Sequence, residues 1–447
     1  MTKSLTGKLS LHPMSRARKC HGTPPISCEK GHFPKPLGPA FHTVEDTAEK
    51  RAPGAVLPAH SSGRDAALDT NQAAGGLRRS PGPPIPDDRR LIVRFPDRLE
   101  YERFLRENRA SELRFGVRDR DIRILPLIRA ISCPAETATR LSLSFGEKAV
   151  WEEDEPIATR ALPKGAIVSD KGIPWGVRHI HAPQAWGKTT GHRVKVGVID
   201  TGADYTHPDL RHSLDRGINL INRMAPPQDD NGHGTHIAGT IAAANELQGM
   251  IGVAPRSTIY PVKAFDHNGT AFVSDIIMGI EWCVRNHMDV VNMSFGMRTK
   301  SRSLLNAVSR AYHSGVLIVA SSGNEGRVGD IDYPAGFGQT IAVGATNRAG
   351  RVAKFTNRSP LIDIFAPGDR IVSTWLRGKH REMSGTSMAT SHVTGAIALL
   401  LALKPGLTPG QIKSIVKNSA VPLRNAKAPR TAGELCVTRI LNAADRL

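Results

Sequence analysis

The chain has 447 residues, of which 40% are hydrophobic and 5% aromatic, and its formal net charge is +19. This length allows two or three domains with a large buried core. Five cysteines are too few for a small disulfide-stapled fold, and no Cys-x-x-Cys pair indicates zinc. No unbroken run of 18 apolar residues predicts a membrane span. Because the positive charge forms no basic helix or arm, we expect no specific nucleic-acid partner.

Residues 1–90 have a composition that is typical of disorder. They are basic, rich in Pro, Gly and Ser, and show almost no apolar periodicity. Such a segment cannot bury enough surface to offset the entropy of ordering it. The first twenty residues contain no continuous apolar stretch, so we read no secretory signal in them.

A small α+β unit is predicted over residues 91–155. Its strand-like segments are 91–95, 121–132 and 149–154, and residues 99–108 have the pattern of an amphipathic helix. Residues 156–172 contain several Pro and Gly, so we expect a linker there.

Residues 173–447 are predicted to form a parallel α/β domain. Continuous apolar strands that alternate with helices indicate a parallel sheet covered on both faces. The predicted strands are 194–200, 257–265, 289–295, 316–323 and 340–346. The predicted helices are 234–244, 274–286, 304–315 and 387–403. The last of these is apolar nearly all round, so we expect it to be central and buried.

Four polar residues stand at the ends of these predicted elements. Asp200 ends a buried strand, His233 precedes a helix, Asn324 follows a strand, and Ser387 opens the buried helix. Each one alone has an ordinary explanation as a turn, helix-start or N-cap residue. A helix N-terminus at Ser387 would also offer N–H groups without intrahelical partners and the positive end of the helix dipole.

The order of these residues resembles that of the subtilisin-like serine proteases. The stretches that carry the resemblance are VGVIDTGADYTHPDL, DDNGHGTHIAGT, VASSGNEG and SGTSMATSHVTGA, and it extends from about Ile173 to the C-terminus. It implies a three-layer α/β sandwich and a serine endopeptidase that cuts proteins and peptides. By this resemblance Ser387 is the nucleophile, His233 the general base, Asp200 the residue that orients it, and Asn324 an oxyanion donor.

The segment 91–155 resembles the inhibitor-type propeptide of the same family, a small ferredoxin-like α+β domain. This resemblance implies a zymogen whose own prodomain acts as an intramolecular inhibitor. Self-cleavage is then expected in the linker, where Arg160 and Lys164 lie. An unrelated small α+β domain is the alternative for this segment.

The resemblance also implies two extended segments that pair with the substrate backbone. One is 292–296, with Ser294, Phe295 and Gly296, and the other is 266–270, with Gly269. Adding a peptide strand between such edges gives affinity through main-chain hydrogen bonds, while pockets read alternate side chains.

Asp332 directly precedes the Tyr-Pro pair that closes the primary specificity pocket in this family. A carboxylate at the base of that pocket favours Arg or Lys before the scissile bond. The alternative is that Asp330 and Asp332 are solvated loop acids or pair with Arg327.

Calcium is the structural ion that the resemblance implies. Asp209 matches an acidic ligand of the family, the loop 245–250 could supply carbonyl ligands, and Glu246 could add a carboxylate. Lys171 falls near a position where relatives supply a Gln ligand, so its charge could take over the role of the ion.

Two questions stay open at this level. A catalytically silent subtilase fold used as a binding module is the alternative to an enzyme, although the four intact residues argue against it. An extracellular location fits a prodomain, and an intracellular protease is the alternative. We expect a monomer.

Overall fold

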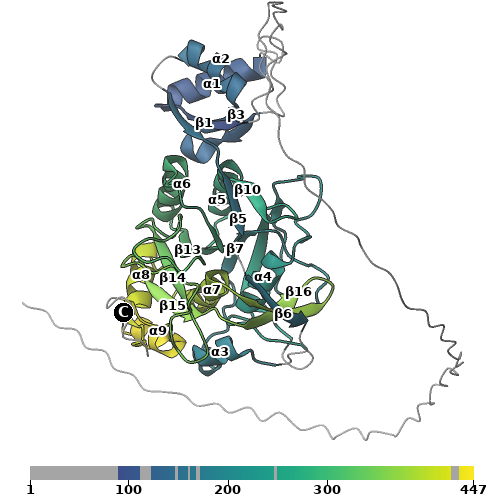
Figure 1. Cartoon of the computed structure of the whole chain (residues 1–447), viewed down its shortest axis with the longest axis vertical. Helices are drawn as coiled ribbons and strands as arrows, with labels where there is room; N and C mark the ends of the chain where they lie inside the picture. The colour runs from purple at the N-terminus through teal and green to yellow at the C-terminus, as the bar shows by residue number, and fades with distance from the viewer. Residues whose placement is uncertain are drawn as a thin grey trace, which may run out of the picture. The chain divides into compact units, whose positions relative to one another are not determined.

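The computed structural model describes residues 89–110, 122–145, 149–159, 162–167, 172–245, 249–423 and 432–446 (Figure 1). The expectation of disorder in the N-terminal segment therefore falls outside the described residues, apart from the last two. Arg160, Lys171 and Glu246 also lie outside them.

The N-terminal unit is a four-stranded antiparallel sheet with two helices, as expected for an α+β domain. Its elements are β1 (Arg90–Arg94), α1 (Arg98–Ala110), β2 (Arg123–Leu125), β3 (Ala130–Pro134), α2 (Ala135–Phe145) and β4 (Val150–Glu153), in the sheet order β2-β3-β1-β4. The predicted strand 121–132 is in fact two strands, because a 3₁₀ turn at Pro126–Ile128 and a left-handed Arg129 reverse the chain. Val93 and Phe104 help to form a small core of the unit's own.

A seven-stranded parallel sheet forms the centre of the second domain. Its strands are β7 (Lys195–Asp200), β8 (Ile218–Asn219), β9 (Thr258–Lys263), β11 (Val290–Met293), β13 (Leu317–Ser321), β14 (Thr340–Thr346) and β15 (Ile364–Pro367). They lie in the order β15-β14-β13-β11-β7-β9-β8, and all neighbours are parallel. The five predicted strands are confirmed, while the short β8 and β15 were not predicted.

Helices cover both faces of this sheet, which makes three layers. On one face, α4 (His233–Ala242) and α7 (Thr386–Leu403) share a core with Val196 and Val198. On the other face, α5 (Val273–Arg285) and α6 (Arg302–His313) share a core with Ile199. Neighbouring strand residues point to opposite faces, so continuous apolar strands feed both cores. The expected α/β sandwich is confirmed.

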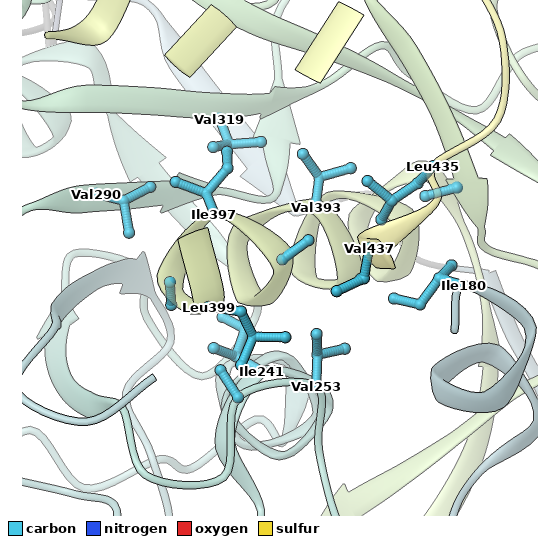
Figure 2. Close-up of a cluster of buried hydrophobic side chains, with 14 of the residues drawn as sticks. Ile180, Ile241, Val253, Val290, Val319, Val393, Ile397, Leu399, Leu435 and Val437 are labelled. Carbon is cyan, nitrogen blue, oxygen red and sulfur yellow. The ribbon is translucent and has the colours of Figure 1, made fainter. Parts of the chain in front are cut away.

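Helix α7 runs through the middle of the first core. Figure 2 shows its residues Val393, Ile397 and Leu399 among side chains from the sheet and from α4, including Val319 and Ile241. Among the described residues, α7 is the one helix long and apolar enough to cross a membrane. However, 89% of it is buried inside the fold, as in the core helix of a globular domain.

Two smaller sheets join the segment 156–172 to the second domain. β5 (Pro156–Thr159) lies between β10 (Thr270–Phe272) and β12 (Phe295–Gly296), and β6 (Leu162–Ile167) pairs with β17 (Lys379–Ser384), which pairs with β16 (Ile371–Trp375). The expected linker thus contains two strands. The remaining elements are α3 (Trp175–His179), a 3₁₀ turn at Pro183–Ala185, α8 (Pro409–Asn418) and α9 (Val437–Ala444).

Candidate active site

The site begins with a carboxylate and an imidazole in direct contact. Asp200 ends β7, His233 opens α4, and His233 Nδ1 lies 2.8 and 2.9 Å from the two carboxylate oxygens of Asp200. Both residues are buried. Burial, the largest single effect, would lower the pKa of His233, but the charge of Asp200, its hydrogen bond to the ring and the charge of Asp229 together raise that pKa above the usual value.

Neighbouring polar groups hold this pair in place. The backbone N–H of Thr201 donates to Asp200 Oδ1 at 2.8 Å, and Thr201 Oγ1 accepts from the N–H of Gly234 at 2.9 Å. A Cβ on Gly234 would lie 2.1 Å from the carbonyl oxygen of Gly202, so only glycine allows the helix to approach the strand end this closely. The Asp–His geometry therefore depends on a small residue next to the histidine.

The second histidine of the same helix has a different role. His236 Nε2 faces the carbonyl oxygens of Ile371 and Arg381 at 3.2 and 3.0 Å, so it carries the proton. Burial lowers the pKa of His236 to about 3. It therefore stays neutral and structural, which leaves His233 as the histidine that can exchange protons.

Ser387 lies at the N-terminus of α7 and contacts the segment before β12. Its hydroxyl donates to the carbonyl oxygen of Ser294 at 2.9 Å, and Ser294 Oγ donates back to the carbonyl oxygen of Ser387 at 3.1 Å. Asn292 Nδ2 donates to Ser294 Oγ at 2.8 Å and fixes that hydroxyl. His233 Nε2 is buried without a hydrogen-bond partner among the described residues. The structure thus leaves the serine hydroxyl turned to a carbonyl instead of the histidine.

Asn324 is held by the first residue of α7. Its Oδ1 accepts from the backbone N–H and the hydroxyl of Thr386, at 2.8 and 2.9 Å. Because both Thr386 groups act as donors here, the amide orientation is fixed and its NH₂ end is directed away from Thr386. Ser387 is the second residue of the helix, so its N–H is among those that have no intrahelical acceptor. The side-chain amide of Asn324 and the backbone N–H of Ser387 are donors of the kind that bind an oxyanion, and Thr386 contacts the first and precedes the second.

The sequence profile of the subtilase family matches residues 191–435, more than half of the chain. The chain belongs to the subtilase family. Subtilisin E of Bacillus subtilis (strain 168) is 41% identical over 290 residues, covering 63% of this chain and 76% of the relative. Subtilisin of Bacillus pumilus is 43% identical over 258 residues (57% and 93%), and an alkaline protease of Shouchella clausii is 42% identical over 273 residues (61% and 68%). This subtilase is therefore a serine endopeptidase that acts on proteins.

The two segments expected to bind substrate in a subtilase enclose a strand of the chain itself. Phe295 and Gly296 pair with Thr159 and Ala158 on one side of β5, and β10 pairs with its other side. The carbonyl oxygen of Gly269 accepts from the N–H of Thr159 at 2.9 Å. Both predicted segments therefore pair with β5, a strand of the chain's own.

Asp332 is fully buried beside the substrate segments of this subtilase. A Cβ on Gly296 would lie 2.5 Å from its Cβ, and one on Gly323 would lie 2.6 Å from its Oδ2. Its carboxylate forms an ion pair with Arg327, which also contacts Asp330. Asp332 therefore pairs with Arg327, which was the alternative expectation. Its carboxylate lies close to both Gly296 and Gly323.

Asp209, the expected calcium ligand, lies in a different part of the domain. Its carboxylate contacts His380 of β17 and Asn245. Glu246, the second expected ligand, is outside the described residues.

Two further residues organise this site and were not predicted from the sequence. The carboxylate of Asp229 accepts from the N–H groups of Asn231, Gly232 and Thr235 and from the Thr235 hydroxyl, so it caps the helix that carries His233. Thr386, which orients Asn324, is the other. An Asp shortly before a Gly-His helix start is a capping signal that could have pointed to Asp229.

Proposed function

We propose that this subtilase cuts peptide bonds through Asp200, His233 and Ser387 and is made as a self-processing zymogen. The observation that supports it most is the buried contact between Asp200 and His233. These residues lie at the ends of β7 and α4, which share a core with α7, the helix that carries Ser387. In the reacting state, the Ser387 hydroxyl turns from the carbonyl of Ser294 to His233 Nε2, a change of one side-chain torsion.

His233 then takes the proton of Ser387 as its oxygen attacks the substrate carbonyl, and later gives that proton to the leaving amine. The carboxylate of Asp200 holds the imidazole with its other proton on Nδ1 and stabilises the imidazolium that forms. The oxyanion of the tetrahedral intermediate is bound by Asn324 and the N–H of Ser387. The acyl-enzyme is hydrolysed by water along the same path.

The N-terminal unit is the proposed prodomain and inhibitor. Its last strand leads directly into β5, which occupies the place of a substrate strand between β10 and β12. Glu152 and Asp154 connect the unit to the peptidase through hydrogen bonds with Ser303 and Ser274. Ile92 and Leu125 of the unit belong to the same buried core as α5 and α6. These contacts support an inhibitor that binds both the cleft and the adjoining helices.

The proposed processing bond is Arg160–Ala161. Both residues lie outside the described residues. The described neighbours on either side support the choice: Thr159 pairs with Phe295, and Leu162 pairs with Ser384, which lies just before Ser387 in the sequence. Lys164, the other candidate, lies within β6.

A preference for Arg or Lys before the scissile bond is proposed on the basis of the acidic groups near the pocket. Glu325, Asp330 and Asp332 are three carboxylates that all lie within ion-pair distance of Arg327. A cluster of carboxylates favours the approach of a substrate guanidinium or ammonium group. Arg160 at the proposed processing bond agrees with this preference.

An extracellular location and a monomeric state stay predictions. The following experiment tests the proposed catalytic residues and the self-processing. The full chain and its Ser387→Ala variant are purified, incubated, and compared by intact mass and by hydrolysis of unfolded casein. We expect only the unmodified chain to cut casein and to lose its N-terminal part, with the new terminus at Ala161. If the unmodified chain cuts casein but stays whole, the zymogen proposal fails; if Ser387→Ala cuts casein as well, Ser387 is not the nucleophile.

A further inference from the structure

The carboxylate of Asp209 lies in a small polar site between three segments. It is buried against the loop that ends at Met250 and against His380 of β17. A Cβ on Gly249 would lie 2.1 Å from Asp209 Oδ1, so the loop can close on the carboxylate only because residue 249 is glycine. The site is thus shaped closely around one negative charge.

Three N–H donors from the chain itself point at this carboxylate. Asn245 Nδ2 lies 2.7 Å from Oδ1, while His380 Nε2 and the backbone N of Met250 lie 2.7 and 3.0 Å from Oδ2. An ionised carboxylate can only accept, so His380 carries a proton on Nε2 and Asn245 presents its amide nitrogen. The carboxylate is therefore bonded to three donors of the chain itself.

The described residues do not fit a calcium ion at this site. Calcium takes six to eight oxygen ligands at about 2.3–2.6 Å. Here the carbonyl oxygens of Asn245, Gly249 and Met250 already accept backbone hydrogen bonds, from the N–H groups of Gly249, Gly172 and Asn245 at 2.7, 2.6 and 3.0 Å. A cation beside Asp209 would meet N–H groups, which carry the same sign of partial charge. This arrangement differs from the calcium site that the family resemblance implies.

Besides calcium, the residues around Asp209 could suggest a site for a transition metal. The nearest ligand atoms of His207, Asp209 and His380 all lie within 4.8 Å of one another. However, His207 Nδ1 accepts from the N–H of Asp209 at 3.1 Å, and its Nε2 donates to the carbonyl oxygen of Lys379 at 2.9 Å. Both nitrogens are in use, so a metal would have to break one of these bonds. Hydrogen bonding accounts for the whole cluster.

We propose that His380 and Asn245 hold Asp209 in place of a calcium ion, so that the fold of this peptidase does not depend on an ion here. The two side chains join the loop after α4 to β17 through the shared carboxylate. Since β17 leads into the helix that carries Ser387, the same contact steadies the chain just before the nucleophile. The ion's role in cross-linking two segments is thus performed by the chain itself.

The first test leaves the site unchanged. The full chain with Ser387→Ala, which cannot digest itself, is dialysed against EDTA and its thermal unfolding is followed with and without added CaCl₂. We expect the same Tm in both. A calcium site that is filled at about 100 times its Kd would raise the Tm by roughly 5–10 °C, and such a rise would overturn the proposal.

The second test removes the donor in the same Ser387→Ala background. We expect His380→Ala to lower the Tm in EDTA by several degrees, because a buried carboxylate loses a charge-assisted hydrogen bond. His380→Gln, which keeps an N–H donor, should lower it less, and His313→Ala, at an exposed histidine, serves as the matched control. An unchanged Tm for His380→Ala contradicts the proposal. So does a zinc-induced rise in Tm that His207→Ala and His380→Ala both abolish.

Discussion

Glu152 Oε2 accepts two hydrogen bonds from Ser303, one from its backbone N–H at 2.9 Å and one from its hydroxyl at 2.8 Å. Asp154 Oδ1 makes the corresponding contact with the N–H of Ser274 at 2.9 Å. Ser274 and Ser303 are the second residues of α5 and α6, so two carboxylates of the N-terminal unit cap two helix N-termini. The unit is therefore connected to α5 and α6, and the strand that follows it, β5, pairs with β10 and β12.

Removing one of these caps should shorten the latency of the zymogen. Glu152→Ala loses a charge-assisted contact with a helix terminus, worth about 1–2 kcal/mol, so the proposed prodomain should bind roughly 5–30 times more weakly. We expect peptidase activity to appear earlier in a time course of the purified chain. Glu153→Ala changes an exposed neighbour and is the control. Equal lag times for the two variants would contradict the proposed docking role.

Asn324→Ala should slow catalysis without unfolding the protein. Loss of one oxyanion donor costs about 3–4 kcal/mol in the transition state, so kcat should fall roughly 10²–10³-fold while KM changes little. Thr386→Val, which removes one of the bonds that orient the amide, should give a smaller loss. Steady-state kinetics on a peptide substrate separate kcat from KM. A large rise in KM with unchanged kcat would assign Asn324 to substrate binding instead.

The pH profile of kcat/KM should report the titration of His233. The base must be neutral to take a proton, so activity should rise with pH through the raised pKa of His233 and then level off. Asp200→Asn removes the charge that raises this pKa, so the midpoint should move to lower pH. The plateau should also fall by about 10⁴-fold, because the imidazole tautomer is no longer fixed. A midpoint that stays in place in Asp200→Asn would show that another group controls the profile.

Substrate preference should depend on the Arg327–Asp332 pair. In Asp332→Asn the ratio of kcat/KM for Arg over Phe before the scissile bond should fall about tenfold, because the buried negative charge is lost. In Arg327→Ala that ratio should rise, because a positive charge that pairs with the carboxylate is lost. Arg351→Ala, at an exposed arginine, is the control. If Phe is preferred over Arg by the unmodified enzyme, the proposed pocket role of Asp332 is refuted.

The sequence by itself determined the elements that carry the proposed catalytic residues. Continuous apolar strands and amphipathic helices have periods that can be read locally, so the five long strands and four helices of the peptidase were predicted close to their ends. The order of Asp200, His233, Asn324 and Ser387 at the ends of these elements was enough to identify the family. β8 has only two residues, too few to show a period, and it was missed, as was the four-residue β15.

Tertiary structure decided the contacts that join distant segments. Residues 156–172 contain Pro and Gly and look like a linker, but β5 (156–159) and β6 (162–167) form within this range because β10, β12 and β17 offer them edges to pair with. The pairing of Asp332 with Arg327, and of Asp209 with His380, depends on which loops the fold brings together. No periodicity encodes such pairs, because each bond depends on a geometry that exists only once the sheet and its helices have packed.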